Sequence, residues 1–182
     1  MFVRSSLAAL LTLCGWLAFR GEAAPSPQEQ PVAAVRHAGP DLETMKGLIG
    51  EWCVADAEGR PSGEVMTRFR LTSNGSAILE ELFPGTANEM VTVYHMDGKE
   101  LVCTHYCGMG NQPFMKAAGG EKPGTLVFEC VRLSNAASMQ EAHMHKGVYV
   151  LKDADHFSVE WSSRDHDKDE THARFDFARK AK

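Results

Sequence analysis

Apolar and polar side chains alternate with a period of two along most of the chain. Between positions 65 and 71 the odd residues are Val, Thr, Phe and Leu, and the even residues are Met, Arg and Arg. This alternation is typical of β-strands, whose successive side chains point to opposite faces. After a first strand that contains Trp52, further strands are predicted at 65–71, 77–83, 90–96, 101–107, 114–118, 125–133, 143–151, 157–163 and 172–177.

Turn signals separate these segments. Asn74-Gly75 and Asp97-Gly98 each predict a tight hairpin. A short helical turn is expected at 41–46, and the pattern contains no long amphipathic helix. A meander of about ten short strands has to close in order to hide its edges. We therefore expect an all-β fold, an antiparallel up-and-down barrel with a short N-terminal helical turn.

The first 40 residues follow a different pattern. Arg4 precedes an apolar run from Leu7 to Phe19, and small residues follow, which predicts a secretory signal at 1–23. A membrane anchor is the alternative, although a span needs ~20 apolar residues. Residues 24–40 are rich in proline and predict a linker. We expect a barrel domain at 41–180 of an exported protein, periplasmic or extracellular, with no membrane span after signal cleavage.

Composition and charge narrow the range of partners. The chain has 182 residues, of which 43% are hydrophobic and 24% charged, and this is typical of one globular domain. Its formal net charge is -5, so there is no basic surface that would attract phosphates. A small-molecule ligand is therefore expected and nucleic acid is not, while the oligomeric state stays open.

The segment Leu48-Ile49-Gly50-Glu51-Trp52 opens the first strand after the helical turn. This Gly-x-Trp start resembles that of the calycin barrels, the superfamily of lipocalins and fatty-acid-binding proteins. The stretch from Met90 to Met115 resembles an uncharacterised group of bacterial calycin-like proteins, and the likeness extends over most of 48–180. The resemblance implies a barrel with one closed end and a cavity, and it carries no established activity.

The second hairpin contains several chemically active side chains. A two-residue turn at Asp97-Gly98 places three pairs on one face, namely Tyr94 with Leu101, Thr92 with Cys103, and Met90 with His105. Cys107 shares this face. Both faces of the hairpin are mixed, so the alternation leaves the inward face open, and the calycin resemblance favours the face with Tyr94 and His105.

The strand at 143–151 has His143 and His145 on the same face as Tyr149. The next strand has a clear inner face, made of Phe157, Val159 and Trp161. A three-residue loop at 153–155 places Tyr149 opposite Val159 and turns both histidines inward, whereas a loop of two or four residues turns them outward. We favour the inward arrangement because Tyr149 and Leu151 form the larger apolar pair.

These choices bring polar and aromatic side chains from several strands into one cavity. The predicted ligand-binding residues are Trp52, Tyr94, His105, Cys107, Asn111, Gln112, Tyr149 and Trp161. A cavity with donors and acceptors at several heights suits a small polar or amphipathic molecule. For each histidine the alternative is a surface position or a hydrogen-bonded core position, and Asn111 and Gln112 equally suit a turn.

A metal site is the first alternative function. His143 and His145 lie roughly 7 Å apart on one face of a strand, a spacing that lets two imidazoles bind one ion. His105 completes the candidate metal site, and Cys107 is another candidate ligand. Zinc, copper and haem all fit these side chains and none is preferred, while Met109 and Met144 suit copper(I).

Four cysteines follow the predicted signal: Cys53, Cys103, Cys107 and Cys130. In an exported protein an even number predicts disulfides, and buried free thiols are the alternative. A free Cys107 with His145 in reach is a candidate for thiol or acid-base catalysis. The sequence favours a secreted ligand-binding barrel without catalysis, with a metal- or haem-binding protein and an enzyme in the same pocket as alternatives.

Overall fold

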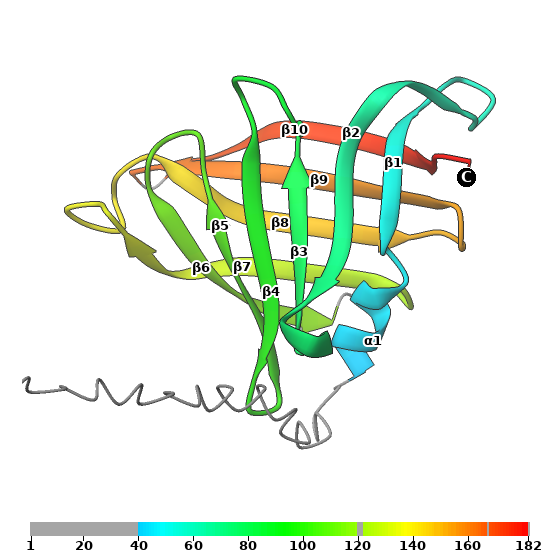
Figure 1. Ribbon diagram of the computed structural model, residues 1–182. Coiled ribbons are helices and arrows are strands. Elements are labelled where there is room, and N and C mark those ends of the chain that lie inside the picture. Colours follow the sequence, from blue (N-terminus) through cyan, green and yellow to red (C-terminus); the bar gives the residue numbers. More distant parts are fainter. Residues whose placement is uncertain (1–39, 120–121, 167, 182) are drawn as a thin grey trace, which may run out of the picture. The chain divides into compact units, whose positions relative to one another are not determined.

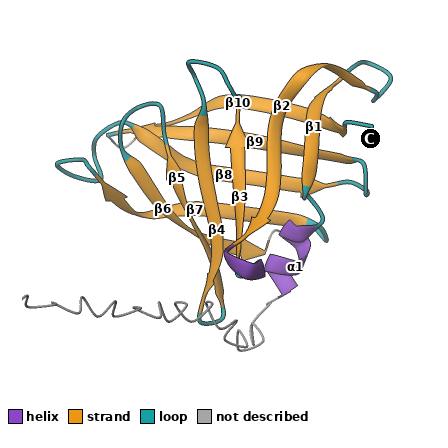
Figure 2. Cartoon of the chain, in the orientation of Figure 1, coloured by secondary structure: helices purple, strands orange, loops and turns teal. Residues whose placement is uncertain are grey.

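Ten antiparallel strands close into one barrel in the computed structural model, which describes residues 40–119, 122–166 and 168–181 (Figures 1 and 2). Helix α1 (Pro40–Lys46) precedes the strands. The strands are β1 (Gly50–Ala55), β2 (Pro61–Thr72), β3 (Ala77–Leu82), β4 (Met90–Asp97), β5 (Glu100–Tyr106), β6 (Gln112–Gly119), β7 (Thr125–Ser134), β8 (His143–Leu151), β9 (His156–Asp165) and β10 (Lys168–Arg179). A 3₁₀ turn at Ser73–Gly75 connects β2 to β3.

The order of the strands around the barrel follows their order in the sequence. Each strand pairs with its neighbours in the chain, and β10 returns to pair with β1, where Cys53 lies opposite Ala178. Closure leaves no unpaired strand edge. The predicted all-β, antiparallel up-and-down barrel of about ten strands is therefore confirmed, together with the short helical turn before it.

Helix α1 covers one end of the barrel (Figure 1). Leu42 and Met45 of this helix are buried in the core. The indole Nε1 of Trp52 donates a hydrogen bond to the carbonyl oxygen of Leu48 at 2.7 Å, and the guanidinium of Arg179 lies 4.0 Å from the centre of the Trp52 ring. Trp52, expected to bind a ligand, is instead packed into this end of the barrel.

The hairpin between β4 and β5 differs in register from the expectation. Its turn begins at Gly98, whose φ is 61°, one residue later than predicted. As a result Tyr94 pairs with Cys103 and not with Leu101. A shift of two residues keeps each side chain on its predicted face, because side chains alternate with a period of two. Tyr94 and His105 are accordingly buried in the barrel interior.

The four cysteines after the predicted signal are free thiols in the described part of the chain, as the alternative to disulfides requires. Three of them, Cys53, Cys103 and Cys130, are buried. Burial among apolar neighbours is the commonest role of a free cysteine. The closed sheet and its core therefore hold these strands together without a disulfide among the described residues.

Two predictions concern the N-terminus. The signal at 1–23 and most of the linker, 24–39, lie outside the described residues. Pro40 was assigned to the linker and instead begins α1, in agreement with the preference of proline for the first turn of a helix. In the part of the chain that the structure describes, no helix has both the length and the apolar character needed to cross a bilayer.

Candidate functional site

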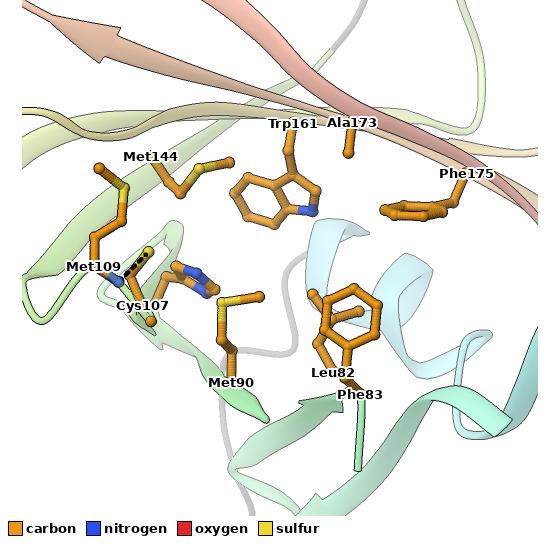
Figure 3. Close-up of a pocket in the computed structure, with 11 residues that line it drawn as sticks. Leu82, Phe83, Met90, Cys107, Met109, Met144, Trp161, Ala173 and Phe175 are labelled. Carbon is orange, nitrogen blue, oxygen red and sulfur yellow. Dashed lines mark hydrogen bonds between the residues drawn. The ribbon is translucent and has the colours of Figure 1, made fainter. Parts of the chain in front are cut away.

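A cavity of about 290 Å³ lies where β3 and β5 end and β4 begins, away from the end that α1 covers (Figures 1 and 3). The residues that line it come from six strands and the segments next to them. They are Leu82, Phe83, Met90, His105, Cys107, Gly108, Met109, Met144, Trp161, Ala173 and Phe175. Because these residues are far apart in the sequence, only the closed barrel brings them together.

The wall of the cavity is mainly apolar. Three thioethers and three aromatic rings make up most of it, from Met90, Met109 and Met144 and from Phe83, Trp161 and Phe175 (Figure 3). Among the described residues that line it, polar side-chain atoms are confined to the imidazole of His105, the indole N–H of Trp161 and the thiol of Cys107. The cavity therefore differs from the expected one, which had donors and acceptors at several heights.

Phe83 reaches the cavity through an uncommon backbone conformation. It follows β3 with a φ of 53°, a value that bulky residues seldom adopt. Its N–H donates a hydrogen bond to the carbonyl of Met66 at 2.8 Å, and its ring centre lies 6.2 Å from that of Phe175. A strained residue persists where its surroundings hold it in place, and strain of this kind is common around ligand sites.

His105 is the main polar group of the cavity and is only 3% exposed. Its Nδ1 lies 2.9 Å from Oγ1 of Thr92, its partner across the β4–β5 pair. Its ring stacks on Trp161 with the centres 5.3 Å apart and the planes at 29°. Burial lowers the pKa of His105 from 6.5 to about 4, so the ring is neutral near pH 7.

Two nitrogens of the cavity wall remain free for a ligand. Within the described residues, neither Nε2 of His105 nor Nε1 of Trp161 has a hydrogen-bond partner. The indole N–H is a donor only, whereas the neutral imidazole can accept or donate according to its tautomer. These nitrogens give an otherwise apolar cavity two points at which a polar group of a ligand can be oriented.

Cys107 lines the cavity but lacks the environment of a nucleophile. Burial raises the pKa of the Cys107 thiol, against a smaller lowering by the N–H of Met109, which donates to Sγ at 3.5 Å. A catalytic thiol needs the opposite shift. The expected base, His145, does not line this cavity, so the structure does not form the predicted pair of Cys107 and His145.

Tyr94 and Tyr149, expected to bind a ligand, belong to a buried polar cluster inside the barrel. Both hydroxyls donate to Oε2 of Glu80, at 2.6 and 3.2 Å, and the hydroxyl of Thr67 donates to Oε1 at 3.1 Å. Desolvation raises the pKa of Glu80, while these hydrogen bonds act in the opposite direction. The two tyrosine hydroxyls therefore satisfy a buried carboxyl group and do not line the cavity.

The loop between β8 and β9 has the predicted length, but a bulge in β8 changes the result. Tyr149 lies opposite Val159, as a three-residue loop requires. The register then shifts between Met144 and Lys146, which marks a β-bulge. Because of this shift Met144 lines the cavity, and His143 and His145 on either side of it do not. The expected convergence of these histidines with His105 is thus not formed.

Asn111 and Gln112 also lie outside the cavity wall. The amide of Asn111 donates to the carbonyl of Ala142 at 2.9 Å, and the amide of Gln112 donates to the carbonyl of Gly110 at 3.0 Å. Both side chains therefore stabilise the turn between β5 and β6 through hydrogen bonds to backbone carbonyls. A role in a turn is the alternative that the sequence left open for these two residues. Of the eight predicted ligand-binding residues, the structure places three in the cavity wall: His105, Cys107 and Trp161.

The candidate metal site made of His105, His143 and His145 is not assembled. Within the described residues, no three side chains from His, Cys, Asp and Glu gather closely enough to hold an ion. The rings of His143 and His145 lie edge to face, with their centres 5.6 Å apart, while His105 lines the cavity. Burial, followed by the positive charge of Arg164, lowers the pKa of His145.

Sequence reasoning missed most of the apolar wall. Met90 shares a face of the β4–β5 hairpin with Tyr94 and His105, the face that the calycin resemblance favours as inward, although it is not among the predicted ligand-binding residues. Phe83 and Phe175 stand at positions that show no chemical signal by themselves. Met144 becomes a wall residue only through the bulge in β8.

Comparisons with known proteins do not assign this chain to a family. No protein-family model matches the sequence, and a search of characterised proteins finds none that is similar to it.

Proposed function

We propose that this protein binds a small, neutral and mainly apolar molecule in the cavity beside His105. The observation that carries the proposal is an apolar cavity of about 290 Å³ with two unpaired nitrogens, Nε2 of His105 and Nε1 of Trp161. Ligand pockets have volumes of about 300–1,000 Å³, so this cavity suits a small ligand. An apolar cavity of about 150 Å³ is enough to hold benzene.

The charge of the cavity wall supports a neutral ligand. No Asp, Glu, Lys or Arg side chain is among the described residues that line it, and the low pKa of His105, caused by burial, keeps the imidazole neutral. A charged group placed there would lose its hydration without gaining a partner of opposite charge. A hydroxyl or carbonyl group on an apolar ring or short chain matches the two free nitrogens.

The calycin resemblance and the predicted signal extend this proposal. Calycin barrels are ligand-binding barrels, and the closed ten-stranded sheet is compatible with such a relationship. We therefore propose an exported calycin-like protein that binds its ligand without transforming it. Burial raises the pKa of Cys107, whereas a nucleophilic thiol needs a lowered one, so the proposal includes no thiol catalysis.

Calorimetric titration of the full chain with p-cresol and with toluene tests the proposal. Both compounds have one apolar ring, and p-cresol adds a hydroxyl that can bond to His105. We expect p-cresol to bind with one site per chain and more tightly than toluene, by about 1 kcal/mol or about fivefold in Kd. Binding of neither compound would contradict the proposal.

A variant that fills the cavity provides the matched test. Ala173 lines the cavity, whereas Ala154 is exposed in the loop between β8 and β9. Ala173→Leu should weaken the binding of p-cresol at least about tenfold, because the larger side chain occupies part of the cavity. Ala154→Leu adds the same atoms elsewhere and should bind as the unaltered chain does. Equal binding by the two variants would place p-cresol outside this cavity.

A further inference from the structure

Three buried side-chain atoms lack a hydrogen-bond partner within the described residues, and they belong to Asn111, His143 and His145. The atoms are Oδ1 of Asn111, Nε2 of His143 and Nδ1 of His145. Asn111 donates its amide N–H to the carbonyl of Ala142, the residue before His143, at 2.9 Å. The rings of His143 and His145 lie 5.6 Å apart. The three unsatisfied residues are therefore neighbours in space.

Two of the unsatisfied atoms are acceptors of hydrogen bonds, and Nδ1 of His145 is a third acceptor in the tautomer that carries its hydrogen on Nε2. Nδ1 of His143 lies 2.6 Å from the carbonyl of Glu141, and a carbonyl can only accept, so Nδ1 carries the hydrogen. In the neutral ring Nε2 then has the free lone pair, and His143 is 0% exposed. Asn111 uses its N–H₂ group as the donor to Ala142, which leaves Oδ1 as an acceptor. Buried polar atoms without partners call for an unseen ion or water.

We propose that Asn111, His143 and His145 bind one divalent transition-metal ion of the zinc class, through one amide oxygen and two imidazole nitrogens. The site is separate from the cavity beside His105 and does not depend on a ligand there. Three protein ligands leave one position of a tetrahedral zinc ion for water. This arrangement differs from the expected site, since Asn111 takes the place of His105.

The geometry of the two rings suits a shared ion. Zn–N bonds of about 2.0 Å at a tetrahedral angle place the centres of two imidazoles roughly 5 Å apart. The observed separation is 5.6 Å and the rings are inclined at 79°. The carbonyl of Glu141 holds His143 by the nitrogen opposite the free one, as the outer partners of metal-binding histidines commonly do.

A water molecule and a cation require different tautomers of His145. Water has two hydrogens, so it can donate to Oδ1 of Asn111 and Nε2 of His143, and it satisfies Nδ1 of His145 as well when that nitrogen carries the hydrogen. A cation accepts all three lone pairs when the hydrogen of His145 is on Nε2. The charged residues around His145 are Arg164, Asp169 and Glu129. Arg164 is bound to Asp169 through Nε and Nη2, at 2.5 and 2.8 Å, so its positive charge is offset beside the site.

Titration of the full chain with Zn²⁺, followed by calorimetry and by ring ¹⁵N NMR of the histidines, tests this proposal. We expect one equivalent to bind, with shifts of Nε2 in His143 and Nδ1 in His145. His145→Gln should weaken this binding at least about tenfold, because it removes one ligand at a half-buried position. His95→Gln is the control, since His95 lies in β4 and bonds to the carbonyl of Met96.

The outcomes separate a built site from weak binding at surface histidines. Zinc that binds His145→Gln as tightly as the unaltered chain, or that shifts other histidine rings, would overturn the proposal. So would the absence of binding at one equivalent, which would leave an ordered water at these atoms. If His145→Gln does not fold, the ring shifts of the unaltered chain still decide the question.

Discussion

In the unfolded chain His105 is hydrated, whereas in the barrel its ring contacts the hydroxyl of Thr92 and stacks on the face of Trp161. This loss of hydration disfavours the charged ring, because none of the cavity-lining residues that the structure describes has a carboxylate to stabilise it. Burial therefore lowers the pKa of His105 to about 4. The same burial that makes the imidazole a neutral ligand group also links the stability of the barrel to pH.

The stability of the folded protein should fall as the pH falls from about 6.5 towards 4. In this range the unfolded chain binds a proton at His105 and the folded protein does not. The contribution is fully present above pH 6.5 and amounts to about 3 kcal/mol when it is completely lost. Urea unfolding measured at several pH values should show this decrease in the free energy of unfolding. In His105→Phe the free energy should change less steeply with pH, by the equivalent of about one bound proton.

Glu80 makes the stability of the folded protein depend on pH in the opposite direction to His105. Desolvation raises the pKa of Glu80, so its stabilising contribution is present below pH 4.5 and is lost as the pH rises through the folded value. This contribution is common to the unaltered chain and to His105→Phe, and it cancels when the two are compared. An identical pH dependence in both proteins would show that His105 titrates normally in the barrel.

At the scale of elements, β8 shows what an alternating pattern can and cannot predict. The length of the loop at 153–155 was decided by the apolar pair Tyr149 and Leu151, and the structure confirms it. The bulge between Met144 and Lys146 has no counterpart in the pattern, because one inserted residue leaves the apolar and polar positions mixed on both sides of it. His143 and His145 consequently do not line the cavity with His105, although His143 is buried.

Gly147 lies opposite Trp161 in the β8–β9 pair, and this contact leaves no room for a side chain. A Cβ at this position would lie 2.9 Å from Cζ3 and 3.0 Å from Cη2 of Trp161. We expect Gly147→Ala to lower the free energy of unfolding by about 1–3 kcal/mol and to weaken the binding of p-cresol, since it displaces the indole.

A double-mutant cycle checks the cause of that loss. Trp161→Phe removes the atoms that the new Cβ meets, so the double variant should lose less stability than the sum of the two single losses. Urea unfolding of the four proteins gives the coupling free energy. Strictly additive losses would mean that Gly147 is needed for a reason other than its contact with Trp161.

At the scale of the barrel, the fold separates packing from binding. One end is filled by Leu42, Met45 and Leu48 and by the ring of Trp52. The cavity lies towards the other end, and the cluster around Glu80 is buried in the interior of the same barrel. Substitutions at the packed end should therefore act on stability alone.

Met45→Ala tests this separation. Met45 is 0% exposed, and its truncation should lower the free energy of unfolding by about 2–5 kcal/mol through lost contacts and a new cavity. The folded fraction should bind p-cresol with an unchanged Kd in calorimetry. A weaker Kd for the folded variant would show that the two ends of the barrel are coupled.

The sequence by itself determined the ten strands, their antiparallel order and which side chains of the β4–β5 hairpin share a face, because alternation is a local property that an even register shift does not alter. Only the tertiary structure decided which side chains share a cavity. Closure of the barrel brings the ends of β3 and β5 next to Trp161 in the middle of β9, and because of a single bulge in β8 the cavity is lined by Met144 and not by the two histidines. Both effects depend on pairing between strands, which the order of residues along one strand does not encode.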